Sequence, residues 1–121
     1  MSVTQKPKYI KEPTPLQYGQ AVLAMLADVE VEDIVKLLDN ARETTLKEMF
    51  FSLEYYSIKY IKEKKTVYSK EELPNIAVLS LETPRCWHWS LYFDGVFYDP
   101  EHGILNNFPT CNRKYYWEIL K

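Results

Sequence analysis

The stretch CWHWSLYFDGVFYD, residues 86–99, consists of two runs of strand-forming residues joined by Asp-Gly at 94–95. Asp-Gly between two such runs is among the strongest sequence signals for a β-hairpin with a two-residue turn. A turn of that length pairs Phe93 with Val96. The stretch therefore predicts an antiparallel hairpin whose register is set by its turn.

Side chains alternate between the two faces of a strand, so this register divides the hairpin into two sets of residues. The first set is expected to be core and consists of Trp87, Trp89, Leu91 and Phe93. The second set consists of Cys86, His88, Ser90, Tyr92, Phe97 and Asp99. His88 and Asp99 are diagonal neighbours in the second set, with Cβ atoms roughly 7–8 Å apart or less. We therefore expect an imidazole–carboxylate hydrogen bond between them.

The pair has two interpretations. Asp99 would fix the tautomer of His88 and stabilise its charged form, as in a catalytic dyad. Alternatively, His88 is a half-buried histidine whose ring simply forms a hydrogen bond with a neighbouring acidic side chain and has no catalytic role. Glu101 lies opposite His88 in the same register and would compete with Asp99, unless Pro100 ends the strand. His102 is expected to be a solvated turn residue.

Upstream of the hairpin the patterns are helical. Residues 20–27 are strongly helix-forming and mostly apolar, which indicates a buried helix. Residues 31–38 carry apolar residues at helical spacing. Thr45 and Glu48 form a capping-box pattern that predicts a third helix to about residue 56.

Further strands are expected at residues 57–61, 66–68, 76–81 and 115–120. Helices followed by strands predict an α+β fold in which N-terminal helices pack on a C-terminal antiparallel β-sheet. The length is that of one domain, residues 1–121. Residues 1–12, polar and with Pro7, are expected to form an extended N-terminal arm.

Composition narrows the function classes. The net charge is −2 and the pI about 5.7, so we expect no nucleic-acid partner. No stretch is apolar enough for a membrane span or a signal peptide, so we expect no membrane association and a reduced, cytoplasmic protein. The two cysteines, Cys86 and Cys111, form no disulfide framework, and only two histidines are present. We therefore expect no metal and no cofactor.

Residues 13–26, PTPLQYGQAVLAML, resemble the opening of papain-like cysteine peptidases related to those that process bacteriocin leader peptides. In that family a Gln, a short spacer and Cys-Gly begin an Ala/Leu/Met-rich helix, and a His strand later leads to Asp-Pro. Residues 88–100, HWSLYFDGVFYDP, are similar to the second part. The resemblance covers about residues 12–100. It implies a papain-like fold, with His88 as the base-like residue and Asp99 as its orienter.

Two positions depart from the family pattern. Tyr18 stands before Gly19, where the family has its nucleophilic Cys, and Glu12 stands where its oxyanion Gln would lie. Gln17 is an offset substitute for that Gln. A phenol with a pKa near 10 is a poor nucleophile at pH 7, and a carboxylate repels a developing oxyanion. The Tyr18 ring is expected either to plug the cleft, with its hydroxyl on His88, or to form part of a peptide-binding surface.

The leading hypothesis is therefore a catalytically inactive peptidase homologue that serves as a protein- or peptide-binding module. An immunity or accessory protein of a bacterial toxin system is one role that would suit such a module. The alternative is an active cysteine hydrolase that uses Cys86, His88 and Asp99. Cys86 is the substitute thiol in that case, because it lies two positions before His88. Otherwise Cys86 is a small buried apolar residue.

Overall fold

The computed structural model describes residues 5–120 of the chain. Within these residues, three α-helices precede a six-stranded sheet. The helices are α1 (Tyr18–Ala27), α2 (Val31–Leu38) and α3 (Leu46–Tyr55). The strands are β1 (Lys65–Thr66), β2 (Ile76–Glu82), β3 (Trp87–Phe93), β4 (Val96–Asp99), β5 (Gly103–Leu105) and β6 (Lys114–Glu118). A short 3₁₀ helix, η1 (Lys70–Glu72), lies between β1 and β2.

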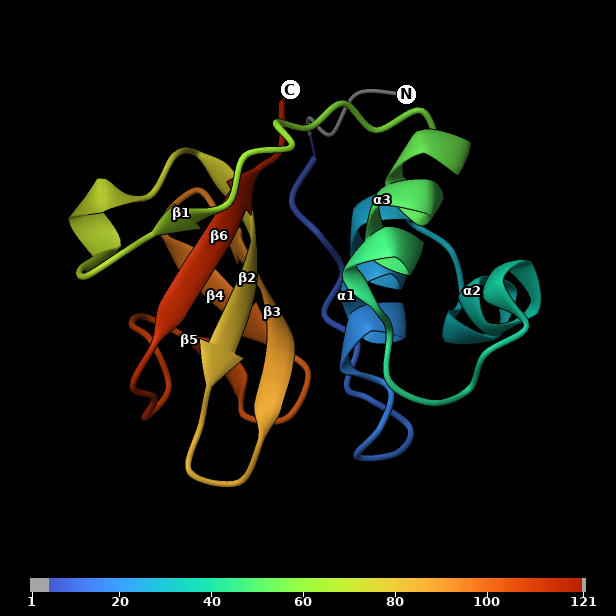
Figure 1. Cartoon of the computed structure of the whole chain (residues 1–121), viewed down its shortest axis with the longest axis horizontal. Coiled ribbons are helices and arrows are strands. Elements are labelled where there is room, and N and C mark those ends of the chain that lie inside the picture. Colours follow the sequence, from blue (N-terminus) through green and yellow to red (C-terminus); the bar gives the residue numbers. More distant parts are fainter. Residues whose placement is uncertain (1–4, 121) are drawn as a thin grey trace.

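The order in the sheet is β1-β6-β2-β3-β4-β5, and every neighbouring pair is antiparallel. The last strand of the chain therefore lies between β1 and β2. Figure 1 shows the three helices together on one side of the sheet. The predicted α+β class, with N-terminal helices on a C-terminal antiparallel sheet, is confirmed.

The hairpin of β3 and β4 has the predicted register, with Phe93 opposite Val96. Both turn residues have positive φ, 44° at Asp94 and 90° at Gly95. A two-residue turn of type I′ requires this conformation at both positions, and Asp-Gly adopts it at low cost. β4 ends at Asp99, directly before Pro100, so the competing pairing of Glu101 with His88 does not form.

The predicted helices are confirmed, and α1 is buried along its whole length. At the start of α3, the Thr45 hydroxyl accepts from the Glu48 N–H and the Glu48 carboxylate accepts from the Thr45 N–H. This is the capping box that the sequence predicts. The strand predicted at residues 57–61 is wrong, because only an isolated bridge between Tyr60 and Ile119 forms there. The strand predicted at residues 66–68 is limited to β1 at the sheet edge.

Both faces of the hairpin are buried, whereas the sequence identified only one as core. Leu91 and Phe93 pack against the helices, and on the opposite face Tyr92 and Phe97 pack in a second apolar cluster. Phe108 and neighbouring loop residues pack against that second cluster. The assignment of Trp87 to the core is wrong, because 44% of this residue is exposed.

The segment before α1 is extended, as predicted, in the part that the structure describes. Residues 6–12 form neither helix nor strand, while residues 1–4 of the predicted arm lie outside the described residues. The Glu12 N–H donates to the Pro100 carbonyl at 3.0 Å, and the Tyr9 hydroxyl donates to the Asp99 carbonyl at 2.6 Å. These bonds attach the arm to the end of β4. Among residues 5–120, none of the helices has the length and apolar character needed to cross a bilayer.

Candidate functional site

The N-terminus of α1 meets β3 at Tyr18 and His88. The two rings are stacked, with centroids 4.4 Å apart and planes inclined by 15°. The next residue, Gly19, allows the Thr44 side chain to pack against α1, because a Cβ at Gly19 would lie 2.4 Å from it. The loop that carries Thr44 is itself held by the indole N–H of Trp89, which donates to the Thr44 carbonyl at 2.9 Å.

The predicted pair of His88 and Asp99 is confirmed. Nε2 of His88 lies 3.0 Å from Oδ2 of Asp99, and both side chains are fully buried. Burial by itself would raise the pKa of Asp99, but the hydrogen bond and charge of His88, with further donors, lower it to about 2. The carboxylate is therefore ionised at neutral pH and accepts a hydrogen bond from the N–H group at Nε2. In the neutral tautomer this leaves Nδ1 of His88 as an acceptor, and Nδ1 has no hydrogen-bond partner within residues 5–120.

Asp99 is also bound by a second histidine. Nδ1 of His102 lies 3.0 Å from Oδ1 of Asp99, and the backbone N–H groups of Glu101 and His102 donate to the same oxygen. The hydroxyl of Ser90 donates to Oδ2. His102 is an exposed turn residue, as predicted, but its imidazole also binds Asp99. Asp99 folds the turn back on itself through its side chain, as Asp commonly does.

His88, Asp99 and His102 place three candidate metal-ligand atoms within 4.8 Å of one another. However, the Asp99 carboxylate already accepts from two backbone N–H groups and from Ser90, in addition to the two imidazoles. A metal would have to displace donors from this saturated carboxylate. The arrangement is better suited to orienting the imidazoles by hydrogen bonds.

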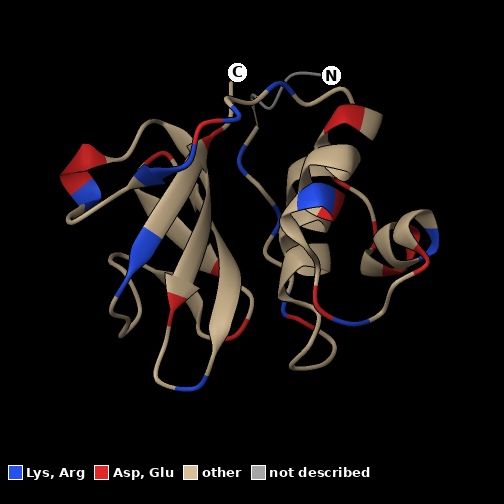
Figure 2. Ribbon diagram, in the orientation of Figure 1, with Lys and Arg blue, Asp and Glu red and all other residues tan. Residues whose placement is uncertain are grey.

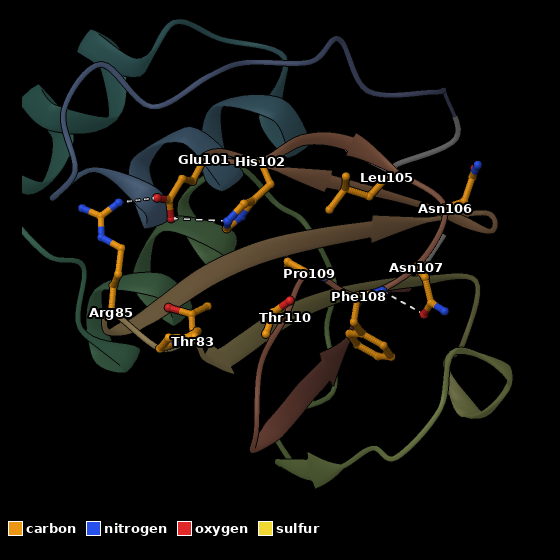
Figure 3. A pocket seen from close by; sticks show the side chains of 11 residues that line it. Thr83, Arg85, Glu101, His102, Leu105, Asn106, Asn107, Phe108, Pro109 and Thr110 are labelled. Carbon is orange, nitrogen blue, oxygen red and sulfur yellow. Dashed lines mark hydrogen bonds and ion pairs between the residues drawn. The ribbon is translucent and has the colours of Figure 1, made fainter.

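His102 borders a hollow of about 700 Å³ (Figure 3). Arg85, Glu101 and His102 lie at one end of it, and Leu105, the last residue of β5, and Phe108 lie at the other end. The hollow therefore has a polar end and an apolar end. Because Asp99 binds both imidazoles, this hollow is linked through one buried carboxylate to the site of Tyr18 and His88.

The hydroxyl of Tyr18 binds Glu101, not His88 as one of our interpretations expected. It donates to Oε1 of Glu101 at 2.9 Å, and Arg85 binds the other carboxylate oxygen at 2.6 Å. Burial, followed by the hydrogen bond to Glu101, raises the pKa of the phenol above its ordinary value. Tyr18 is therefore a neutral hydrogen-bond donor at neutral pH.

Glu12 and Gln17 are the two candidates for the oxyanion position, and Glu12 has a carboxyl group in place of an amide. Burial, with the charge of Glu101, raises the pKa of Glu12 to about 7. Oε2 of Glu12 is buried and has no hydrogen-bond partner within residues 5–120, and the same holds for Oε1 of Gln17. Glu12 is thus a carboxyl group beside the carboxylate of Glu101, in a place that disfavours further negative charge.

Cys86 differs from the expectation in two respects. It is exposed rather than buried, and it precedes β3 rather than forming part of the strand. Its sulfur lies 3.9 Å from the hydroxyl of Tyr18, and within residues 5–120 no hydrogen bond joins it to His88. Cys111 is half-buried, which raises the pKa of its thiol.

A second hollow, of about 280 Å³, lies between the start of α1 and the helix-facing side of the sheet. We call it the interlayer hollow. Its lining includes Tyr18, Thr44, Trp87, His88 and Trp89. Thr44 and His88 are buried, and each contributes an atom without a hydrogen-bond partner within residues 5–120, Oγ1 and Nδ1 respectively. Sequence patterns did not indicate Thr44, because it comes from a loop and is placed only by packing.

No protein-family model matches the chain, and no curated protein matches it with significant similarity.

Proposed function

We propose that the chain is a papain-like peptidase homologue without peptidase activity, which binds an extended peptide segment of another protein. The observation that carries the proposal is the position of Tyr18. Its ring covers the imidazole of His88, and its hydroxyl is bound to Glu101. Tyr18, at the position that corresponds to the nucleophile, thus stacks a neutral phenol on His88, the base-like residue.

The interlayer hollow supports a peptide as the ligand. Nδ1 of His88 accepts a hydrogen bond in the neutral tautomer, and Oγ1 of Thr44 is able to donate one. A peptide group supplies one N–H and one C=O, which are the kinds of partner that these two atoms lack. Trp87 and Trp89 provide apolar walls for a side chain.

The alternative, a hydrolase with Cys86 as nucleophile, has less support. The Cys86 sulfur contacts the Tyr18 hydroxyl and is not bonded to His88. A thiol is activated by a base within hydrogen-bond reach, and the group that the Cys86 sulfur contacts is a neutral phenol. A role as an immunity or accessory protein of a bacterial toxin system stays part of the proposal, and the bound segment would then belong to a toxin component.

The test is a selection from a displayed library of random heptapeptides against the wild-type protein and two variants. Trp87→Ala removes a wall of the interlayer hollow, and Tyr68→Ala removes an aromatic residue of which 79% is exposed elsewhere. We expect the wild type and Tyr68→Ala to enrich a shared set of sequences and Trp87→Ala to lose it. Enrichment that is no stronger for the wild type than for Trp87→Ala would contradict the proposal. Cleavage of the enriched peptides by the wild-type protein would support the hydrolase instead.

A further inference from the structure

The helices cover only part of the sheet face that they contact. On β3 they cover Leu91 and Phe93, whereas Trp87 is 44% exposed. Tyr115 on β6 belongs to the same face, because it pairs with Ser80, which in turn pairs with Trp89. The rings of Trp87 and Tyr115 are stacked, with centroids 5.8 Å apart and planes inclined by 13°. We call this pair the aromatic shelf.

Cations surround the aromatic shelf. The guanidinium of Arg113 lies 5.3 Å from the ring centroid of Trp87, and the Lys64 ammonium lies 4.5 Å from that of Tyr115. A third cation, Lys62, lies 5.8 Å from the Phe50 ring on α3. Figure 2 shows basic residues at the start of β6 and beside β1. Each of these cations lies within about 6 Å of a ring centroid, the distance at which a cation and a ring attract each other.

The two cations of the shelf differ in their partners. Arg113 forms two hydrogen bonds with Glu82, at 3.1 and 3.0 Å. In contrast, neither Lys62 nor Lys64 forms an ion pair within residues 5–120. Lys64 therefore leaves an uncompensated positive charge beside Tyr115, whereas Glu82 offsets the charge of Arg113.

The shelf is continuous with the interlayer hollow, because Trp87 and Ser80 line that hollow and also adjoin Tyr115. A peptide with one residue in the hollow would pass over the shelf with its neighbouring residues. We propose that the peptide bound by this protein is acidic, with Asp or Glu side chains that lie over the aromatic shelf beside Lys64 and Arg113. The inference rests on the proposed function and adds the chemical class of the ligand.

Aromatic rings with nearby cations also suit single-stranded nucleic acid. The charge of the chain favours a peptide, because a net charge of −2 weighs against binding the polyanionic backbone of a nucleic acid. An oligonucleotide is therefore the competing ligand in the test.

The experiment uses the peptides enriched by the wild-type protein and compares three selections. The double variant Lys64→Gln/Arg113→Gln removes two charges beside the shelf. Its matched control is Lys36→Gln combined with Lys47→Gln, which removes two charges from α2 and α3. Wild type and control should enrich Asp and Glu at positions adjacent to an apolar residue, and the double variant should lose that preference while it still enriches the apolar residue.

Binding of one enriched peptide is then measured by fluorescence anisotropy, beside its isostere with Asn and Gln for Asp and Glu. We expect the acidic peptide to bind about tenfold more tightly at low salt, as for charge-assisted hydrogen bonds. The difference should disappear in about 1 M salt, where the screening length is about 3 Å. A short oligothymidylate should bind more weakly than the acidic peptide.

Each other result has a distinct meaning. Equal binding of the acidic peptide and its isostere would overturn the inference and leave the proposed function intact. An acidic preference that survives in Lys64→Gln/Arg113→Gln would also overturn it, because residues other than Lys64 and Arg113 would then bind the acidic side chains. Tighter binding of the oligothymidylate would overturn the inference and indicate that the ligand is a nucleic acid. Failure of the wild-type protein to enrich any peptide would contradict the proposed function itself.

Discussion

The hydroxyl of Tyr18 donates a 2.9 Å hydrogen bond to the carboxylate of Glu101, which lies 83 positions later in the chain. This bond directs the phenol away from His88, although the two rings are stacked. The start of α1 is thereby linked to the turn after β4, beside the buried carboxylate of Asp99. Tyr18 therefore contributes to the packing of the helical layer on the sheet.

Substitution of Tyr18→Phe should keep the ring stack and remove the bond to Glu101. We expect a loss of about 1 kcal/mol in the free energy of unfolding, typical of one hydrogen bond of a partly buried group. Urea denaturation measures the loss, and Tyr68→Phe at an exposed position is the control. Equal stability of the two variants would show that the bond to Glu101 contributes nothing.

The variant Tyr18→Cys tests whether the site can still activate a thiol. The new sulfur would lie at the N-terminus of α1, where the helix dipole favours a thiolate, and next to His88. We expect it to be alkylated by iodoacetamide at pH 6 faster than Cys86, and more slowly when His88→Gln is added. An alkylation rate that is the same with and without His88→Gln would mean that His88 and Asp99 do not act as an acid–base pair on this thiol. Mass spectrometry of the labelled peptides separates the sites.

The raised pKa of Glu12 should be visible in how the free energy of unfolding depends on pH. Its pKa in the folded protein is raised to about 7, so between the ordinary glutamate value and pH 7 the folded state holds a proton that the unfolded state has lost. Stability therefore falls as pH rises through this window. Glu12→Gln should be more stable than wild type by about 1 kcal/mol at pH 8, after allowance for the exposed part of the side chain, and should gain nothing at pH 4. Urea denaturation at both pH values tests this, and an equal difference at both would contradict it.

Asp99 should show the opposite dependence. Its pKa is lowered to about 2, so its contribution to stability is present above the ordinary aspartate value and is lost as pH falls towards 2. Asp99→Asn should cost about 3 kcal/mol at pH 7, because it leaves buried donors facing an amide. The difference in free energy of unfolding between wild type and variant should close between pH 4 and pH 2.

His102→Ala should lower the free energy of unfolding less than His88→Ala does, since the His102 side chain is 41% exposed and that of His88 is buried.

Alkylation of the natural thiols tests the hydrolase alternative. Cys86 should react faster than Cys111, because Cys86 is exposed and burial raises the pKa of Cys111. We expect His88→Gln to leave the rate of Cys86 unchanged between pH 5 and 9. Fast reaction of Cys86 at pH 6 that slows in His88→Gln would instead indicate a thiolate–imidazolium pair and favour the hydrolase.

The sequence by itself determined the elements that depend on local patterns. Helical spacing and the capping box at Thr45 predicted the helices, and Asp-Gly at 94–95 predicted the hairpin register. That register brought His88 and Asp99 together, because alternation along paired strands decides which side chains share a face. These features follow from interactions between residues that are near in the chain or paired across a tight turn.

Only the tertiary structure decided the rest of the site. The Tyr18 hydroxyl binds Glu101, His102 joins Asp99, and Thr44 borders the interlayer hollow, all through loops whose course no periodic pattern encodes. The exposure of Trp87 likewise depends on how far the helices extend over the sheet. Such contacts arise when whole layers pack, since the backbone groups of loops are satisfied by partners distant in sequence.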